Sequence, residues 1–203
     1  MKKKLLLIWF FVLLLLSINF IYASAEAPKN YLRGKFYTTV KDNFLVATDK
    51  MMDPLFEKTV IVMIQNDEAG AWGLVINKPI GLIPLSSLVN LSENIEDKTE
   101  QLNKIDLPVF WGGPVDVGKI FILHTKEYRS ETTKYYKEIS VSSDYKILFD
   151  IAEKKGPKKS LIIMGYSGWG SGQLEGEMEK DHWILSDIDL NTIFDEESNT
   201  KWE

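Results

Sequence analysis

Two runs of β-branched and apolar residues, separated by a short polar turn, constrain the fold of this chain more than any other feature. The first run, Thr59 to Ile64, has the composition of a buried strand. The segment that follows, Asn66 to Gly70, is rich in residues that adopt tight turns. The second run, Ala71 to Asn77, ends before Pro79. The sequence therefore predicts a β-hairpin over residues 59–77.

Other short apolar runs predict further strands, and single helices lie between them. We expect strands at 44–47, 107–111, 119–124, 135–141, 160–164 and 183–185. We expect helices at 84–89, from about 143 to 156, and from about 172 to 180. The polar stretch 92–104 is predicted to be a surface connection, because strands resume on both sides of it. Hairpins mixed with single helices indicate an α+β fold rather than a doubly wound parallel sheet.

The N-terminal residues have a different composition from the rest of the chain. Three lysines precede an apolar run that continues to Leu16, and small residues at Ala23 and Ala25 precede Glu26. This order is typical of a cleavable secretory signal peptide. An uncleaved membrane anchor is the alternative, because the apolar run is close to the shortest that spans a bilayer.

We therefore divide the chain into a signal peptide, residues 1–25, and one domain, residues 26–203. The expected location is outside the cytosol, in the periplasm or at the cell surface, and membrane contact is expected only if the signal peptide stays uncleaved. Removal of the signal leaves 178 of the 203 residues and takes three lysines away, so the net charge changes from −5 to −8. An acidic protein is repelled by nucleic-acid phosphates, so we expect no nucleic-acid partner. The chain has no cysteine, which excludes disulfides and thiol chemistry.

The segment from Gly165 to Glu175, GYSGWGSGQLE, is the densest in glycine. We expect it to form a loop between a strand and a helix, with backbone N–H groups that hold an anion. Trp169 would then stack on a ligand, close over it as a lid, or fill a groove. The segment lacks the lysine of a P-loop and the spacing of a dinucleotide fingerprint. Ser167 also lacks the GxSxG context of a nucleophile elbow.

The two histidines have no decisive partner in the sequence. Glu175, Glu179 and His182 would share one face of the predicted helix, where they would align as metal ligands. The second Glu-x-x-His pair that di-iron sites need is missing, so we predict no metal and no cofactor. His124 ends an apolar strand, which favours a structural role. Asp53 precedes a proline and is typical of a turn or a helix cap.

Taken together, these segments resemble the YqgE/AlgH family of bacterial proteins. The matching segments follow the family's order and spacing between about Leu32 and Trp202. They are LVA at 45–47, DPLF at 53–56, GAWGLVINKP at 70–79, WGGPV at 111–115, LH at 123–124, the glycine-rich segment at 165–175, and Trp183. The resemblance implies an α+β fold with a mixed, partly barrel-like sheet and a few flanking helices. It implies no established reaction, although one branch is linked to regulation of exopolysaccharide synthesis. Family members usually lack an export signal, so a cytoplasmic location is a further alternative.

We therefore expect a non-catalytic binding or regulatory module for a small molecule or a protein partner. Its ligand site would lie at strand ends and glycine segments. The candidate residues are Asp53, Asn77, Gly112, Gly113, Pro114, His124, Tyr166, Gly168, Trp169, Gln173 and Glu175. The alternative is a hydrolase-like enzyme for a small molecule, with His124 or Glu175 as acid or base, which requires these groups to meet in one pocket. A structural envelope protein that self-associates is a third hypothesis.

Overall fold

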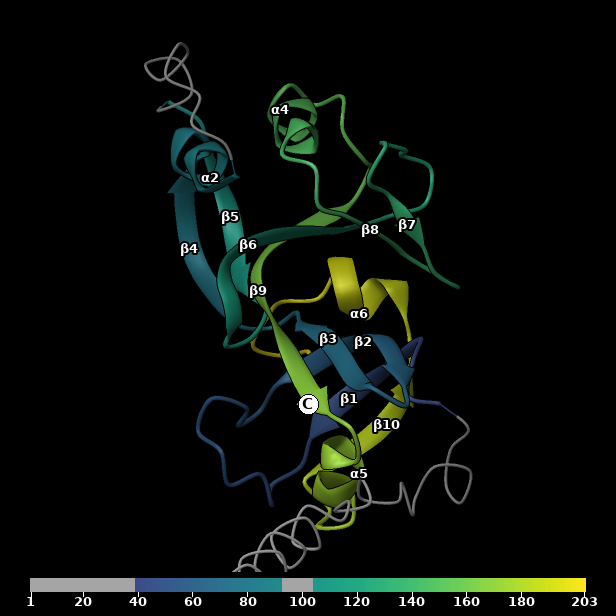
Figure 1. Ribbon diagram of the computed structural model, residues 1–203. Helices are drawn as coiled ribbons and strands as arrows, with labels where there is room; N and C mark the ends of the chain where they lie inside the picture. Colours follow the sequence, from purple (N-terminus) through teal and green to yellow (C-terminus); the bar gives the residue numbers. More distant parts are fainter. Residues whose placement is uncertain (1–38, 93–103) are drawn as a thin grey trace, which may run out of the picture. The chain divides into compact units, whose positions relative to one another are not determined.

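The computed structural model describes residues 39–92 and 104–203 (Figure 1). The predicted signal peptide and most of the polar stretch 92–104 lie outside these residues. The described part contains ten strands and four short helices. They are β1 (Asn43–Ala47), β2 (Val60–Asp67), β3 (Gly70–Val75), β4 (Pro79–Pro84), α2 (Leu85–Ser92), β5 (Asp106–Trp111), β6 (Val115–His124), β7 (Lys134–Tyr135), β8 (Ser140–Ser142), α4 (Lys146–Ala152), β9 (Ser160–Gly170), α5 (Gln173–Met178), β10 (Trp183–Asp187) and α6 (Leu190–Phe194).

The strands form a mixed, curled sheet in which β9 is shared by two groups of strands (Figure 1). The strand order is β10–β1–β2–β3–β9–β6–β8–β7, and β5 pairs with both β9 and β4. The first part of β9 is antiparallel to β6 and parallel to β5. Its last part, Ser167–Gly170, is antiparallel to β3. The predicted α+β fold with a partly barrel-like sheet is confirmed.

The predicted hairpin over residues 59–77 is also confirmed, as the antiparallel pair β2 and β3. Alternate side chains of β2 enter two different cores, because successive residues of a strand point to opposite faces. Val60, Val62 and Ile64 join one core, whereas Ile61 and Met63 join the other. Both faces of this hairpin are therefore covered, which explains the unbroken apolar run that the sequence shows there.

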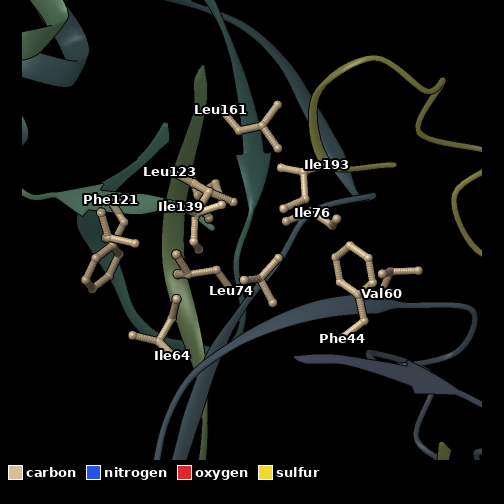
Figure 2. Close-up of a cluster of buried hydrophobic side chains, with 13 residues drawn as sticks. Phe44, Val60, Ile64, Leu74, Ile76, Phe121, Leu123, Ile139, Leu161 and Ile193 are labelled. Carbon is tan, nitrogen blue, oxygen red and sulfur yellow. The ribbon is translucent and has the colours of Figure 1, made fainter. Parts of the chain in front are cut away.

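The first of these cores collects side chains from both groups of strands (Figure 2). Its labelled members are Phe44, Val60, Ile64, Leu74, Ile76, Phe121, Leu123, Ile139, Leu161 and Ile193. A further core lies under α2 and α4, whose buried leucines and isoleucine pack on β5, β6 and β9. Burial of apolar area stabilises such a fold by roughly 25 cal/mol per Å², so these cores fix how the strands that carry the polar residues are placed.

The prediction of a glycine-rich loop at 165–172 is wrong, because β9 continues through Gly170. The glycines of this part of β9 allow the strand to bend and allow a second backbone segment to approach it closely. Gly165 has a φ of +72°, and a Cβ there would lie 2.5 Å from the carbonyl oxygen of Gly113. Gly113 has a φ of +147°, and a Cβ there would lie 2.2 Å from the carbonyl carbon of Tyr166. A side chain fits at neither position, so the two glycine segments pack backbone against backbone.

Two other elements differ from their predictions. Residues after Pro79 form a strand, β4, which pairs only with β5 in the described part of the chain. Proline lacks a backbone N–H group and is tolerated in such edge strands. The single strand predicted at 135–141 is divided into β7 and β8, which pair with each other. Within the described residues, no helix combines the length and the apolar character needed to cross a membrane.

Candidate functional site

Two candidate residues near the start of β2 are bound to the backbone. Asn77 is buried, its Oδ1 accepts from the Val60 N–H group at 2.9 Å, and its Nδ2 donates to the Lys58 carbonyl at 2.8 Å. The side chain therefore joins the end of the hairpin to the turn that precedes β2. Asp53 is exposed, and its carboxylate accepts from the Leu55 N–H group at 2.9 Å, as the predicted turn cap would.

The segment from Gly112 to Pro114 lies against β9. The Gly112 N–H group donates to the Met164 carbonyl at 2.8 Å. The Gly112 carbonyl in turn accepts from the Val75 N–H group at 3.1 Å and from the Ser167 hydroxyl at 3.0 Å. Ser167 has an exposed fraction of 0%, so its hydroxyl joins two backbone segments and meets no solvent. Pro114 is exposed.

His124 belongs to a buried chain of hydrogen bonds. Its Nδ1 lies 2.8 Å from the Thr125 carbonyl oxygen, which can only accept, so Nδ1 carries the proton. Its Nε2 then accepts from the Ser142 hydroxyl at 2.9 Å, and Ser142 accepts from Thr133 at 2.7 Å. Burial lowers the pKa of His124 and outweighs the opposing effects of the Thr125 carbonyl and the Glu127 carboxylate. The imidazole is therefore held neutral between β6 and β8.

Trp169 and Gln173 belong to a set that we call the tryptophan–glutamate cluster. Glu177 is at its centre: one carboxylate oxygen accepts from the indole N–H of Trp169 at 2.9 Å and from that of Trp183 at 2.7 Å. The other oxygen accepts from Gln173 at 3.1 Å. Phe56 packs beside both indoles, with ring centroids 5.7–6.2 Å apart.

Glu177 was missed by the sequence reasoning, which singled out its neighbours Glu175 and Glu179. The available signal was its position three residues after Leu174 on the side of α5 that is buried. Glu175 is itself 5% exposed, whereas Glu179 is exposed.

A hollow of about 280 Å³ lies elsewhere on the sheet, and we call it the lysine–aromatic pocket. It is formed by one end of β3, the middle of β6, the segment from 132 to 136, β8 and the bend of β9. Its lining residues are Trp72, Lys119, Phe121, Thr132, Lys134, Tyr136, Val141, Ser142, Ser143 and Tyr166. Of the predicted site residues, only Tyr166 lines it.

The lining of this pocket has a simple chemical composition. Aromatic rings form one wall: Trp72, Phe121 and Tyr166 have centroids 5.6–6.0 Å apart, in tilted and edge-to-face arrangements. Two lysine ammonium groups provide the charge, and further polar atoms are the hydroxyls of Thr132, Ser142, Ser143, Tyr136 and Tyr166; among the described residues no carboxylate or histidine lines the pocket. Neither Lys119 nor Lys134 forms an ion pair with another residue of the ranges that the structure describes.

A second hollow, which we call the glycine-side hollow, lies on the other side of the Trp72–Tyr166 pair. It brings together three of the predicted residues, Tyr166, Gly168 and Trp169, with Gln65 and Asp67 of β2. Its polar groups already bond with each other, because Gln65 accepts from the Trp72 indole at 3.1 Å and donates to Asp67. The other predicted residues line neither hollow.

The sequence carries a signal for the lysine–aromatic pocket. Thr132, Lys134 and Tyr136 are spaced by two, as are Lys119 and Phe121. In extended backbone this spacing places side chains on one face. Nothing in the sequence shows that the two faces meet. Outside the gaps at 1–38 and 93–103, no three acidic or histidine side chains gather as a metal site would require.

Comparison with known proteins places the chain in a family. A family model described as AlgH-like matches residues 44–203. The UPF0301 protein AlgH of Pseudomonas aeruginosa is 37% identical over 166 residues, which cover 78% of this chain and 82% of that protein. A UPF0301 protein of Rickettsia canadensis is 35% identical over 173 residues, which cover 84% of this chain and 89% of the relative.

Solved structures agree with this result. The solution structure of AlgH from Pseudomonas aeruginosa matches with a TM-score of 0.66 at 36% identity, over 78% of this chain and 82% of the other. A crystal structure of a Corynebacterium diphtheriae protein matches with a TM-score of 0.60 at 15% identity, over 81% and 84% of the two chains, and so shares the fold. The names of these proteins state no activity. The sequence match over most of the chain, together with the shared fold, shows that this protein belongs to the AlgH-like family.

Proposed function

We propose that this AlgH-like protein is a non-catalytic binding module and that a small molecule occupies its lysine–aromatic pocket. The observation that carries the proposal is the pocket itself: a hollow of about 280 Å³ with an aromatic wall and several polar groups. Small-molecule sites combine an apolar lining with a few placed polar groups, and they begin at roughly 300 Å³. The pocket therefore suits a compact ligand.

The positions of the two predicted acid–base residues favour binding over catalysis. A general acid or base must lie within hydrogen-bond reach of the substrate. His124 and Glu175, the two candidates for this role, line neither hollow. The two residues also come from distant parts of the fold. His124 bonds to β8, and Glu175 belongs to α5. β8 and α5 lie at opposite ends of β9 (Figure 1).

The contact between His124 and Ser142 is the one observation that favours a hydrolase. A nucleophile and its base lie at such a distance, with the base oriented by a third group. Ser142, however, has an exposed fraction of 0%, and its oxygen already accepts from Thr133. A hydroxyl with these bonds anchors β8 at the wall of the pocket, and its proton is already donated to His124.

A thermal-shift screen of the purified protein against small metabolites tests the binding proposal. A ligand that binds only the native state raises the melting temperature. We expect hits whose effect is lost in Thr132→Trp, because a large ring at this exposed position fills the hollow. The matched control is Glu131→Trp, which adds the same ring next to the pocket and should keep the effect. A screen without hits, or hits that are indifferent to Thr132→Trp, would contradict the proposal.

We further propose that this module acts outside the cytosol. The support is the sequence of residues 1–25, with its basic start, apolar run and small residues before Glu26. N-terminal sequencing of the protein from fractionated cells is the test, and we expect a mature chain that starts at Glu26. Full-length protein in the cytosolic fraction would refute this location.

A further inference from the structure

We propose that the ligand of the lysine–aromatic pocket is a small anion that carries a flat ring, as an aryl carboxylate or an aryl phosphate does. This inference rests on the proposed binding function and names the chemical class of the ligand. Three features of the pocket support it: its charge, its neutral donors and its ring wall.

The charge of the pocket is opposite to that of the protein. The whole chain has a net charge of −5, yet the lining holds two lysines and, within the residues that the structure describes, no acid. Lys119 extends over the Phe121 ring, with its Nζ 5.2 Å from the ring centroid, and Lys134 is exposed. Since neither has an ion pair within the described ranges, an anion would supply the missing opposite charge. The lysine ammonium acts as a point charge, so it binds carboxylate and phosphate alike.

Two hydroxyl groups stand beside these lysines. Thr132 and Ser143 are exposed and line the pocket, and the Ser143 N–H group donates to the Thr132 oxygen at 3.3 Å. The hydroxyl of Ser142, which also lines the pocket, donates to His124 and is not available. An anion has several acceptor lone pairs, so neutral donors next to two ammonium groups complete its coordination.

The aromatic wall explains why a bare inorganic ion is a poor match. Trp72 and Tyr166 are partly exposed, and their rings meet edge to face at an interplanar angle of 74°. An ion alone would leave this apolar surface wet, whereas a flat ring covers it and gains the energy of aromatic contact. The volume of about 280 Å³ limits the ligand to a compact molecule.

The glycine-side hollow provides a contrast within the same molecule. It shares Trp72 and Tyr166 with the lysine–aromatic pocket, but its charged residue is Asp67 and its lining has no cation among the described residues. An aryl anion would therefore find the same rings there together with an unfavourable charge. We expect it to bind on the lysine side.

A titration of the purified protein followed by amide NMR tests the inference with simple probes. Benzoate and phenyl phosphate carry a ring and a charge, benzamide carries the ring alone, and acetate and inorganic phosphate carry the charge alone. We expect the aryl anions to bind at least about tenfold more tightly than the other probes. Benzamide lacks the charge, and charged hydrogen bonds contribute more than neutral ones. Acetate and inorganic phosphate lack the ring and therefore the contact with the aromatic wall. Shifts should centre on Lys119, Lys134 and Ser143, which line the lysine–aromatic pocket and not the glycine-side hollow, and added salt should weaken binding.

Variants of the two lysines sharpen this test. Lys119→Met and Lys134→Met keep an unbranched side chain only one heavy atom shorter and remove its charge, so each should weaken benzoate binding by roughly tenfold. The double variant should bind benzoate no better than benzamide. Lys180→Met, at an exposed lysine that lines neither hollow, is the control and should leave binding unchanged.

The possible results separate the ligand class from the binding function. If benzamide binds as tightly as benzoate, or if both lysine variants bind benzoate normally, the anion inference is overturned and the binding module stands. If shifts centre on the glycine-side hollow, the assigned pocket is wrong. If none of the probes binds and the metabolite screen is also blank, both proposals fail.

Discussion

The lysine–aromatic pocket and the tryptophan–glutamate cluster use similar side chains in opposite ways. Each combines aromatic rings with charged groups, from β3, β6, β7 and β9 in the pocket and from β9, α5 and β10 in the cluster. In the cluster, Glu177 accepts three side-chain hydrogen bonds and Trp169 is only 6% exposed. In the pocket, Lys119 and Lys134 lack ion pairs within the described ranges, and the rings of Trp72 and Tyr166 are partly exposed.

This difference separates residues that hold the fold from residues that are available to a ligand. Glu177 is half-buried, but the indoles of Trp169 and Trp183 are buried, and a buried N–H group without an acceptor costs about 1–3 kcal/mol, so the cluster must satisfy these donors internally. An exposed lysine costs little to leave unpaired, because water solvates it until an anion arrives. Substitutions in the cluster should therefore reduce stability, and substitutions at the pocket lysines should reduce ligand binding.

The largest effect is expected where the glycine segments cross. In Gly113→Ala the new Cβ would lie 2.2 Å from the Tyr166 backbone, which cannot move without separating β9 from its neighbours. We expect a loss of at least about 4 kcal/mol in the free energy of unfolding, a large share of the stability of a typical domain. Urea denaturation measures it. Gly118→Ala, where nothing lies within 4 Å, is the control and should change stability by less than about 1 kcal/mol.

Glu177→Ala should have the next largest effect. It leaves two indole N–H groups without their acceptor, at a cost of about 2–4 kcal/mol in the free energy of unfolding. Glu179→Ala, at the exposed residue that follows the same helix, should stay within about 0.5 kcal/mol. Benzoate affinity per folded molecule should not change in either variant. A selective loss of benzoate binding in Glu177→Ala would show that the two regions are not separate.

A smaller effect is expected from pH, through His124. Its pKa is lowered in the folded protein, so the unfolded chain binds a proton first as the pH falls. The contribution of the neutral imidazole is thus fully present above the unfolded pKa of about 6.5 and is lost as the pH falls below it. The slope for one proton is at most about 1.4 kcal/mol per pH unit. Urea denaturation between pH 7.5 and about pH 5 should show this loss in the native protein and a weaker dependence in His124→Gln; equal slopes would contradict it.

The smallest change in stability is expected at the pocket lysines. Lys119→Met and Lys134→Met break no ion pair among the described residues and should alter the free energy of unfolding by no more than about 0.5 kcal/mol. Chemical denaturation of each variant without ligand measures this. A loss above about 2 kcal/mol would show that these lysines support the fold, and the comparison with the cluster would fail.

Most strands and helices could be predicted from local patterns, because burial imposes a periodicity on the sequence. The β2–β3 hairpin and the buried first half of β9 are examples. The glycine segment at 165–172 could not be assigned in this way, because glycine serves both loops and close backbone contacts. Only the position of Gly113 beside Tyr166 in the folded protein shows that this segment makes a close backbone contact and is not a loop.

The sequence by itself determined the α+β class, the absence of disulfides, the acidic balance and the family resemblance. These properties follow from composition, order and local spacing. The tertiary structure alone decided which polar residues meet. Lys119 and Lys134 reach one hollow because β6 and β7 flank β8 in the sheet, and Trp72 and Tyr166 join them because β9 bends at Gly165 to pair with β3. Such contacts depend on strand pairing between residues far apart in the chain, which no local pattern encodes.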